Sequence, residues 1–272
     1  MKKGIGYYLL LVTSALLFTY FLLLITYKEP FAKVPLSTAV FDAEGSLLGA
    51  RVAADGQWRF GSAEKIPEKY LISLVAFEDR HFYRHPGVNP AAILRALIQN
   101  IRARELVSGG STISMQVIRM SLKKSRTVWH KLVEMVLAIQ LETRNSKAEI
   151  LELYASHAPF GGNVVGLEAA SWRYFGRPPL ELSWAEAATL AVLPNAPSLM
   201  HPGRNREALQ KKRDRLLDYL LTTKVIDSID FQLAVAEKLP LKPLDLPKRA
   251  EHLVDFYKKQ GLDRVESSID SR

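Results

Sequence analysis

The sequence of 272 residues contains no cysteine, which excludes several kinds of chemistry. Without thiols a chain has no disulfide framework, no thiolate nucleophile and no cysteine-ligated zinc. Its six histidines show no HExxH or other metal-ligand spacing, and P-loop, GxSxG and dinucleotide motifs are absent. No organic cofactor is therefore expected, and catalysis must depend on other side chains.

Acidic residues are fewer than basic ones. Thirty-seven Lys and Arg against 28 Asp and Glu leave a net charge of +9. This balance favours anionic partners such as phosphates, nucleic acid or acidic lipid headgroups, and charge alone does not choose among them. With 48% apolar and 24% charged residues, the chain has the composition of a globular protein of one large domain or two modest ones.

Charged residues are also absent between Gly4 and Tyr27, and residues 5–25 are mostly large and apolar. A helix over these residues would be roughly 32 Å long, enough to cross a hydrocarbon core of about 30 Å. Lys2 and Lys3 precede the run, so the positive-inside rule predicts a single-pass anchor over residues 1–30 with a cytoplasmic N-terminus. A cleaved signal peptide is the alternative, but the run exceeds the usual h-region of about 7 to 15 residues, and no small-x-small site precedes Lys28.

The rest of the chain is predicted to be mainly α-helical, with a small β element over residues 37–60. Its strands are expected over 37–41 and 47–53, with a turn at 42–45. Helical signals dominate from residue 61 to 235. Helix starts are indicated by Pro67, by Asn89 before Pro90, and by the capping-box patterns Ser146-x-x-Glu149 and Ser183-x-x-Glu186. Gly176 and Pro194 indicate helix ends. One stripe with a helical period consists of Leu94, Leu97, Ile98 and Ile101. Three prolines predict a linker over 236–263.

Glu78 stands where a predicted helix should carry an apolar residue. It continues the stripe of Leu71, Leu74 and Val75. Burial would raise the pKa of its carboxyl toward the range in which a general base works near neutral pH. The alternative is a frayed helix end at which Glu78 pairs with Arg80 or Arg84.

A second acid, Glu134, lies in the run 132–141, in which only Glu134 and Gln140 are polar. Two partly buried acids on separate helices are a common arrangement for glycosyl transfer. A structural salt bridge, for example with Lys131, is the alternative.

Between the two acids lie Gly109-Gly110-Ser111-Thr112 and a basic segment. Glycines and hydroxyl residues at a helix start can present backbone N–H groups to an anion. The same four residues also fit an ordinary turn with an N-cap, and a basic segment is often a solvated face or a contact with lipid headgroups. Seven cations oppose one acid, Glu105: Arg102, Arg104, Arg119, Lys123, Lys124, Arg126 and Lys131.

Five segments, in order, carry a resemblance to a known family: EDRHFYRHPG (78–87), GGSTISMQ (109–116), HKLVE (130–134), KAEILELYAS (147–156) and KKRDRLL (211–217). They resemble the motifs of the peptidoglycan glycosyltransferases of family 51, the transglycosylase module of class A penicillin-binding proteins. The segments DGQWRF, APFGGN and AVLPNAPS are most similar to class C-type members. The chain departs from the motifs at Met115, His130 and Ser156, where the family usually has Gln, Arg and Asn.

The resemblance implies a role for each matching residue. Glu78 would be the base that deprotonates the 4-hydroxyl of lipid II. Glu134 would assist at the pyrophosphate end of the donor, either directly or through Mg²⁺ or another divalent cation. The implied substrate-binding residues are Asp79, Phe82, His85, Ser111, Thr112, Gln116, Arg119, Arg126, His130, Lys131, Lys147 and Arg213.

The implied fold is a lysozyme-like helical domain with a smaller membrane-dipping jaw. The implied activity is polymerisation of lipid II into glycan strands, with inversion and release of undecaprenyl diphosphate, by a protein of the bacterial inner membrane whose catalytic domain is extracytoplasmic. Partners would be lipid II, the growing glycan, membrane lipid and other cell-wall synthesis or division proteins, but not nucleic acid. Residues 264–272 resemble the start of a transpeptidase domain, which suggests either a truncated bifunctional protein or a monofunctional one.

Two other functions stay open. A lysozyme-like domain with an acid on a helix could hydrolyse glycan instead of building it. The motif departures allow a weakly active enzyme or a noncatalytic partner in a cell-wall complex, because His130 cannot form the bidentate phosphate contact of an arginine.

Overall fold

The computed structural model describes residues 6–8, 10–15, 17–18, 29–61, 65–103, 109–122, 127–195 and 204–269. The chain is mainly helical, as predicted, and divides into two compact units. Unit 1 comprises residues 1–33 and 83–150, and unit 2 comprises residues 34–82 and 151–272. The helical domain predicted over 61–235 thus contributes to both units.

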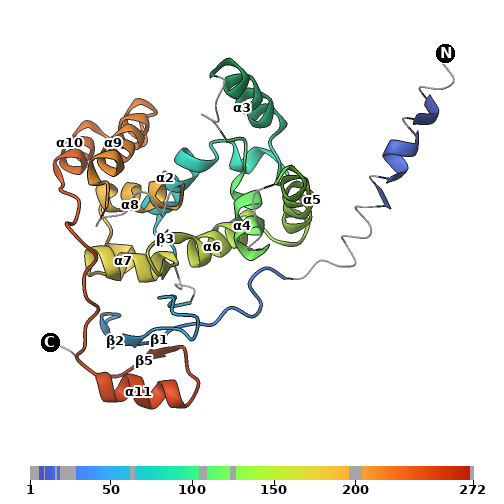
Figure 1. Ribbon diagram of the computed structural model, residues 1–272. Helices are drawn as coiled ribbons and strands as arrows, with labels where there is room; N and C mark the ends of the chain where they lie inside the picture. The colour runs from blue at the N-terminus through green and yellow to red at the C-terminus, as the bar shows by residue number, and fades with distance from the viewer. Residues whose placement is uncertain are drawn as a thin grey trace. The chain divides into compact units, whose positions relative to one another are not determined.

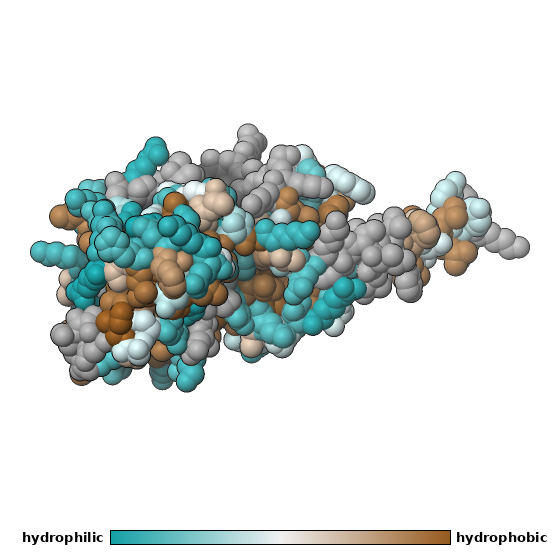
Figure 2. Space-filling model, turned by 90° about the horizontal axis from the view of Figure 1, so that it is seen from below, coloured by the Kyte–Doolittle hydropathy of each residue, from teal (hydrophilic) through white to brown (hydrophobic). Residues whose placement is uncertain are grey.

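Only part of the predicted anchor lies within the described residues, since 1–5, 9, 16 and 19–28 lie outside them. The described residues between 6 and 18 are helical, and their apolar side chains are exposed. In Figure 2, brown patches of hydrophobic residues lie among teal hydrophilic residues at the surface. Among the residues that the structure describes, no helix combines the length and the apolarity needed to cross a membrane. The anchor stays a prediction.

Unit 2 contains a three-stranded sheet in the order β2-β1-β5. Strands β1 (Thr38–Phe41) and β2 (Leu47–Arg51) form the predicted antiparallel hairpin. Asp42 holds the turn, because its Oδ1 accepts hydrogen bonds from the backbone N–H groups of Glu44 (3.0 Å) and Ser46 (2.7 Å). Strand β5 (Arg264–Glu266) pairs in parallel with the other edge of β1.

Helix α11 (Glu251–Lys259) covers this sheet (Figure 1). Its Val254 is fully buried against Val40 and Leu48. The segment 236–263, predicted as a linker, therefore includes a packed helix, and residues 264–266 complete the sheet of unit 2. The three prolines mark only the irregular chain before α11, and residues 270–272 lie outside the described part.

Several other helices of unit 2 pack around α8 (Trp184–Val192). All but the first residue of α8 are buried, and it packs against α2 (Glu68–Glu78), α9 (Arg206–Thr222) and α10 (Ser228–Ala236) (Figure 1). The predicted capping box is confirmed, since the Ser183 and Glu186 side chains accept from each other's backbone N–H groups. The short helices η2 (Pro179–Glu181) and η3 (Leu193–Asn195) flank α8.

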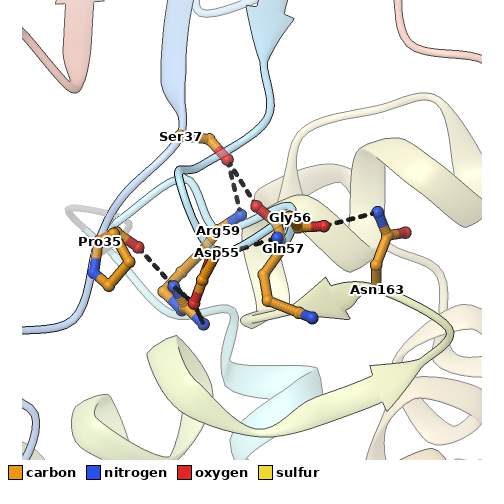
Figure 3. A network of polar contacts seen from close by, with 7 residues as sticks. All are labelled: Pro35, Ser37, Asp55, Gly56, Gln57, Arg59 and Asn163. Atoms are coloured by element: carbon orange, nitrogen blue, oxygen red, sulfur yellow. Dashed lines mark hydrogen bonds and ion pairs between the residues drawn. The ribbon is translucent and has the colours of Figure 1, made fainter.

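A network of polar contacts joins the segment after β2 to the turn between β3 (Pro159–Gly161) and β4 (Val164–Val165). Figure 3 shows Asn163 donating to the carbonyl of Gly56 (3.0 Å), and Arg59 contacting Asp55 and the carbonyl of Pro35. Backbone bonds from Trp58 N to Asn163 O (2.7 Å) and from Val165 N to Trp58 O (2.9 Å) extend it. The segments DGQWRF and APFGGN thus form one structural element next to α7 (Leu167–Phe175), which ends at Gly176 as predicted.

Unit 1 contains α3 (Pro90–Ala103), α4 (Ile113–Leu122), α5 (Val128–Arg144) and the start of α6 (Lys147–His157); η1 (Phe82–Arg84) lies at the boundary of the units. Asn89 caps α3 as predicted, accepting from Ala92 N at 3.0 Å. The apolar stripe of α3 does not face a core: Leu94, Leu97, Ile98 and Ile101 are 58%, 55%, 41% and 67% exposed.

Candidate active site

Glu134 is buried on α5, as its position in an apolar run predicts. It is 7% exposed and shares the inward side of the helix with Ala138 and Leu141. Its partner is Arg119 on α4: Nε lies 3.1 Å from both carboxylate oxygens, and Nη2 lies 3.0 Å from Oε2. Nη2 also donates to Ser111 Oγ at 2.8 Å. Three residues predicted to serve the donor phosphate are thus brought together.

A second acid on α5, Glu142, was not singled out from the sequence. Ser114 Oγ donates to Glu142 Oε1 at 2.5 Å, and Lys147 Nζ lies 2.7 Å from the same carboxylate. Lys147 Nζ also donates to the backbone carbonyl of His85 at 2.8 Å. Two predicted residues, His85 and Lys147, are therefore in direct contact, and Glu142, an acid that no motif indicates, joins Lys147 to Ser114. Because Ser114 precedes Arg119 while Glu142 follows Glu134, α4 and α5 run antiparallel.

Packing explains the glycines of two motifs. A Cβ on Gly110 would lie 2.7 Å from Ile93 Cα, and a Cβ on Gly87 would lie 2.5 Å from the carbonyl oxygen of Ala138. Thr112 caps α4, accepting from Met115 N at 3.2 Å, and its hydroxyl donates to Gly87 O at 2.5 Å. Thr112 thus supplies the N-cap that the alternative interpretation of the GGST segment predicted, and anion binding by the amides of this segment stays a prediction.

Glu78 is the last residue of α2, in unit 2, and is half-buried. The fully buried residues of α2 are Tyr70, Ser73 and Leu74, whereas Leu71 and Val75 are half-buried, so the predicted inward stripe is rotated. The guanidinium carbon of Arg80, one predicted partner, lies 3.9 Å from the centre of the Tyr219 ring, and Arg80 Nε donates to Ala76 O. The predicted rise in the pKa of Glu78 stays a prediction.

The charge of Glu78 changes the pKa values of two other residues, Tyr70 and Lys212. Burial and, second, this charge raise the pKa of Tyr70. Burial lowers the pKa of Lys212 on α9, and the charge of Glu78 opposes that change. Lys212 Nζ donates to Asn195 Oδ1 at 3.0 Å. The motif-like segment KKRDRLL predicts a role for the next residue, Arg213, and not for Lys212.

Arg213 has the contacts of a structural side chain. It is 1% exposed and donates to Asp214 Oδ1 (2.8 Å), Glu237 O (2.6 Å) and Val235 O (3.3 Å). These bonds fix α9 to the end of α10. A role for Arg213 in binding substrate stays a prediction that this geometry does not favour.

The other predicted substrate-binding residues are scattered. Phe82 is fully buried and Asp79 is 7% exposed. Gln116 is half-buried on α4 and Lys131 is exposed on α5. His130 forms part of the cap of α5, since Thr127 Oγ1 lies 3.0 Å from its Nδ1 and 3.1 Å from its backbone N. Arg126 lies outside the described residues.

The donor set does not fit a metal ion well. No group of three or more His, Asp or Glu side chains that could hold one occurs among the described residues. Both oxygens of Glu134, the predicted metal ligand, face the guanidinium of Arg119. No chemical step is therefore derived through a metal, and a divalent cation at Glu134 stays a prediction.

Comparison with known proteins decides the family. The family model described as transglycosylase matches residues 46–221. The chain belongs to the transglycosylase family. This stretch of the transglycosylase contains both glutamates, the Arg119 and Lys147 contacts, and Lys212.

Two curated relatives are similar to this transglycosylase. Penicillin-binding protein 1C of Escherichia coli (strain K12) is 39% identical over 244 residues, which cover 89% of this chain and 32% of that protein. Penicillin-binding protein 1A of Aquifex aeolicus (strain VF5) is 38% identical over 226 residues, covering 82% and 31%. The chain thus spans about a third of the length of these relatives.

A crystal structure of penicillin-binding protein 1A from Haemophilus influenzae matches 84% of this transglycosylase and 24% of that chain. The sequence identity is 20% and the TM-score is 0.45. This similarity is too low to carry an argument about the fold, so the lysozyme-like architecture stays a prediction.

Proposed function

We propose that this transglycosylase is a peptidoglycan glycosyltransferase that polymerises lipid II into glycan strands, with inversion at the donor's anomeric carbon and release of undecaprenyl diphosphate. The observation that carries the proposal is the family match over residues 46–221, together with the contacts of Arg119 with Glu134 and Ser111 inside it.

The proposed chemistry needs a stabilised anion at the donor. A diphosphate leaving group carries charge that cations and hydroxyl donors can stabilise as the glycosidic bond breaks. Arg119 and Ser111 supply such groups, and Arg119 is 26% exposed at its side chain, so a ligand can reach it. The buried carboxylate of Glu134 holds the guanidinium in place. Lys147, held by Glu142 and the carbonyl of His85, would supply a further cation.

The acceptor needs a base. In the proposed reaction Glu78 takes the proton of the 4-hydroxyl of lipid II while the hydroxyl oxygen attacks the donor sugar. Glu78 is half-buried at the end of α2, so it is partly open to an incoming hydroxyl group, although its Oε1 is itself buried. Hydrolysis is the weaker alternative, because a neutral glycan gives no reason for an arginine and a lysine that are each held by a buried acid.

Contact with membrane lipid, at the outer face of the bacterial inner membrane, is part of the proposal. It is supported by the uncharged run over residues 4–27 and by large apolar side chains exposed in unit 1. Besides the stripe of α3, these include Val128, Trp129 and Leu132 at the start of α5, which are 82%, 67% and 49% exposed. A tryptophan among such residues is typical of membrane interfaces.

Replacing Glu78 by glutamine tests the proposal. Glu78→Gln keeps the shape of the side chain and removes the base, so glycan synthesis from lipid II should fall by at least about 100-fold. Exposed Glu68 on the same helix offers a matched control, because Glu68→Gln makes the same change without touching the proposed site. Glycan products would be resolved by gel electrophoresis, and circular dichroism would verify the fold.

The products also separate the alternatives. Long glycan from lipid II supports the proposed synthase, shortened wall fragments from purified peptidoglycan would indicate a hydrolase, and no product from either substrate would indicate a noncatalytic partner. Near wild-type synthesis by Glu78→Gln would contradict the role of Glu78. The same assay with a chelator tests the metal: an unchanged rate would contradict a divalent cation at Glu134.

A further inference from the structure

Close to the end of α2 lies a lysine that the proposed mechanism does not use. Lys212 is half-buried on α9, and its ammonium donates to Asn195 Oδ1 at 3.0 Å. Asn195 is the last residue of η3, which directly follows α8. Because α9 packs against both α8 and α2, Lys212 belongs to the contact among three helices of unit 2.

The chain that follows Glu78 runs along the same face of α9. The guanidinium carbon of Arg80 lies 3.9 Å from the centre of the Tyr219 ring. Tyr219 follows Lys212 by seven residues, about two helical turns, so both side chains project from one side of α9. The end of α2 and this side of α9 therefore face each other.

The charges at this place support a coupling between the lysine and the glutamate. The negative charge of Glu78 raises the pKa of Lys212 and so opposes the effect of burial. Asn195 occupies one of the three donors of the ammonium and leaves two for other acceptors. Charged or titratable groups on the elements packed around Glu78 include Lys69, Tyr70, Asp79, Arg80, Glu186, Lys212 and Tyr219; of these, Glu186 binds Ser183 N at the start of α8 and Arg80 stacks on Tyr219.

We propose that Lys212 is a positioning residue for Glu78, holding its carboxylate ionised and oriented toward the incoming hydroxyl group, with Asn195 fixing the ammonium. This inference rests on the proposed function, in which Glu78 is the base. A nearby opposite charge stabilises a carboxylate relative to its acid form. Lys212 would therefore extend the activity of Glu78 to lower pH.

The experiment is the pH profile of kcat/KM for lipid II polymerisation, which reports the ionisation of the free enzyme. Lys212→Met should move the acidic limb up by about one pH unit, because loss of the opposite charge raises the pKa of the base. Below that limb the variant should be about tenfold slower, and the difference should disappear at higher pH. Lys212→Arg keeps the charge and should restore most of the wild-type profile.

Lys211 supplies the matched control, since it is exposed on the same helix and Lys211→Met removes the same charge. An acidic limb that coincides in Lys212→Met and Lys211→Met, or an equal shift in Lys212→Arg and Lys212→Met, would overturn the inference. If Lys212→Met does not fold by circular dichroism, Lys212→Gln provides the same comparison with a polar side chain.

The proposed function and the positioning role of Lys212 can be refuted separately. An inactive wild-type chain, or full activity in Glu78→Gln, would overturn the proposed function. An active wild type, an inactive Glu78→Gln and an unshifted Lys212→Met would overturn only the positioning role of Lys212.

Discussion

Gly87 is predicted to be irreplaceable for reasons of packing. A Cβ at this residue would lie 2.5 Å from the carbonyl oxygen of Ala138 and 2.9 Å from Ile139 N. Both atoms belong to the backbone of α5, so they cannot move aside as the tip of a flexible side chain can. In addition, Gly87 has a φ of +94°, in the left-handed region that L residues disfavour.

The two effects can be estimated separately. The backbone conformation costs an alanine about 1 to 2 kcal/mol, and overpacking against a fixed backbone adds about 1 to 3 kcal/mol. Gly87→Ala should therefore lower the free energy of unfolding by about 2 to 5 kcal/mol, a large part of the roughly 5 to 15 kcal/mol that stabilises a domain. The assay is urea denaturation followed by circular dichroism.

Three other glycines provide controls. Gly45 has a φ of +81° with nothing within 4 Å of its Cβ position, so its replacement by alanine measures the backbone term alone. Gly110 lacks a left-handed φ but its Cβ would meet Ile93 Cα at 2.7 Å, so it measures packing alone, and Gly109 has neither feature. A loss for Gly87→Ala no larger than that for Gly109→Ala would refute the reasoning.

Two further predictions concern buried charge in unit 2. Burial lowers the pKa of His157 to about 4 from 6.5, so the free energy of unfolding is highest above about pH 6.5 and falls as the pH drops toward 4. In urea melts, the wild type should lose about 2 kcal/mol over this pH range, and His157→Gln should not show this loss. Equal losses in the two proteins would contradict the burial of His157. Nη1 of Arg264 lies 2.8 Å from each carboxylate oxygen of buried Glu168, so Arg264→Met should destabilise the fold by about 2 kcal/mol. Because burial raises the pKa of Glu168, this carboxylate takes up a proton more readily, and the loss of stability should be larger at pH 8 than at pH 5. Arg51→Met breaks a pair with exposed Asp255 and should lower the free energy of unfolding much less. Equal losses in the two variants would contradict the prediction.

Features that depend on a few neighbouring residues could be predicted from the sequence. The hairpin at residues 38–51, the caps at Asn89 and Ser183 and the helix stop at Gly176 require only local hydrogen bonds and backbone angles. The burial of Glu134 could also be predicted from its immediate neighbours, because a polar residue within a mostly apolar stretch of helix is buried together with the apolar residues around it.

Features that depend on distant partners could not be predicted. The period of Leu94 and Ile101 gives the orientation of an apolar face but not what it contacts, and in the structure that face is exposed. Helix α11 was missed because the prolines before it dominate the local signal, whereas Val254 is placed by its contact with Val40, more than 200 residues earlier.

The partners of the candidate active-site residues also depend on helix packing and could not be predicted from the sequence. Glu134 could be paired with Lys131 from spacing alone, yet the packing of α4 on α5 gives it Arg119 instead. Adjacent helical residues differ by about 100° in direction, and this separates Lys212, beside Glu78, from Arg213, buried under α10. A motif locates such a segment, but only the tertiary structure says which of its four cations faces the acid.

The parallel pairing of β1 with β5 has a consequence for biosynthesis. The edge of β1 that β5 covers is made about 220 residues before its partner, at residues 264–266. At about 5 to 20 residues per second, a ribosome needs roughly 10 to 45 s to deliver the missing strand. During this interval the nascent chain exposes an unpaired strand edge, which is a template for aggregation, and a chaperone that binds the emerging N-terminal third would shield it.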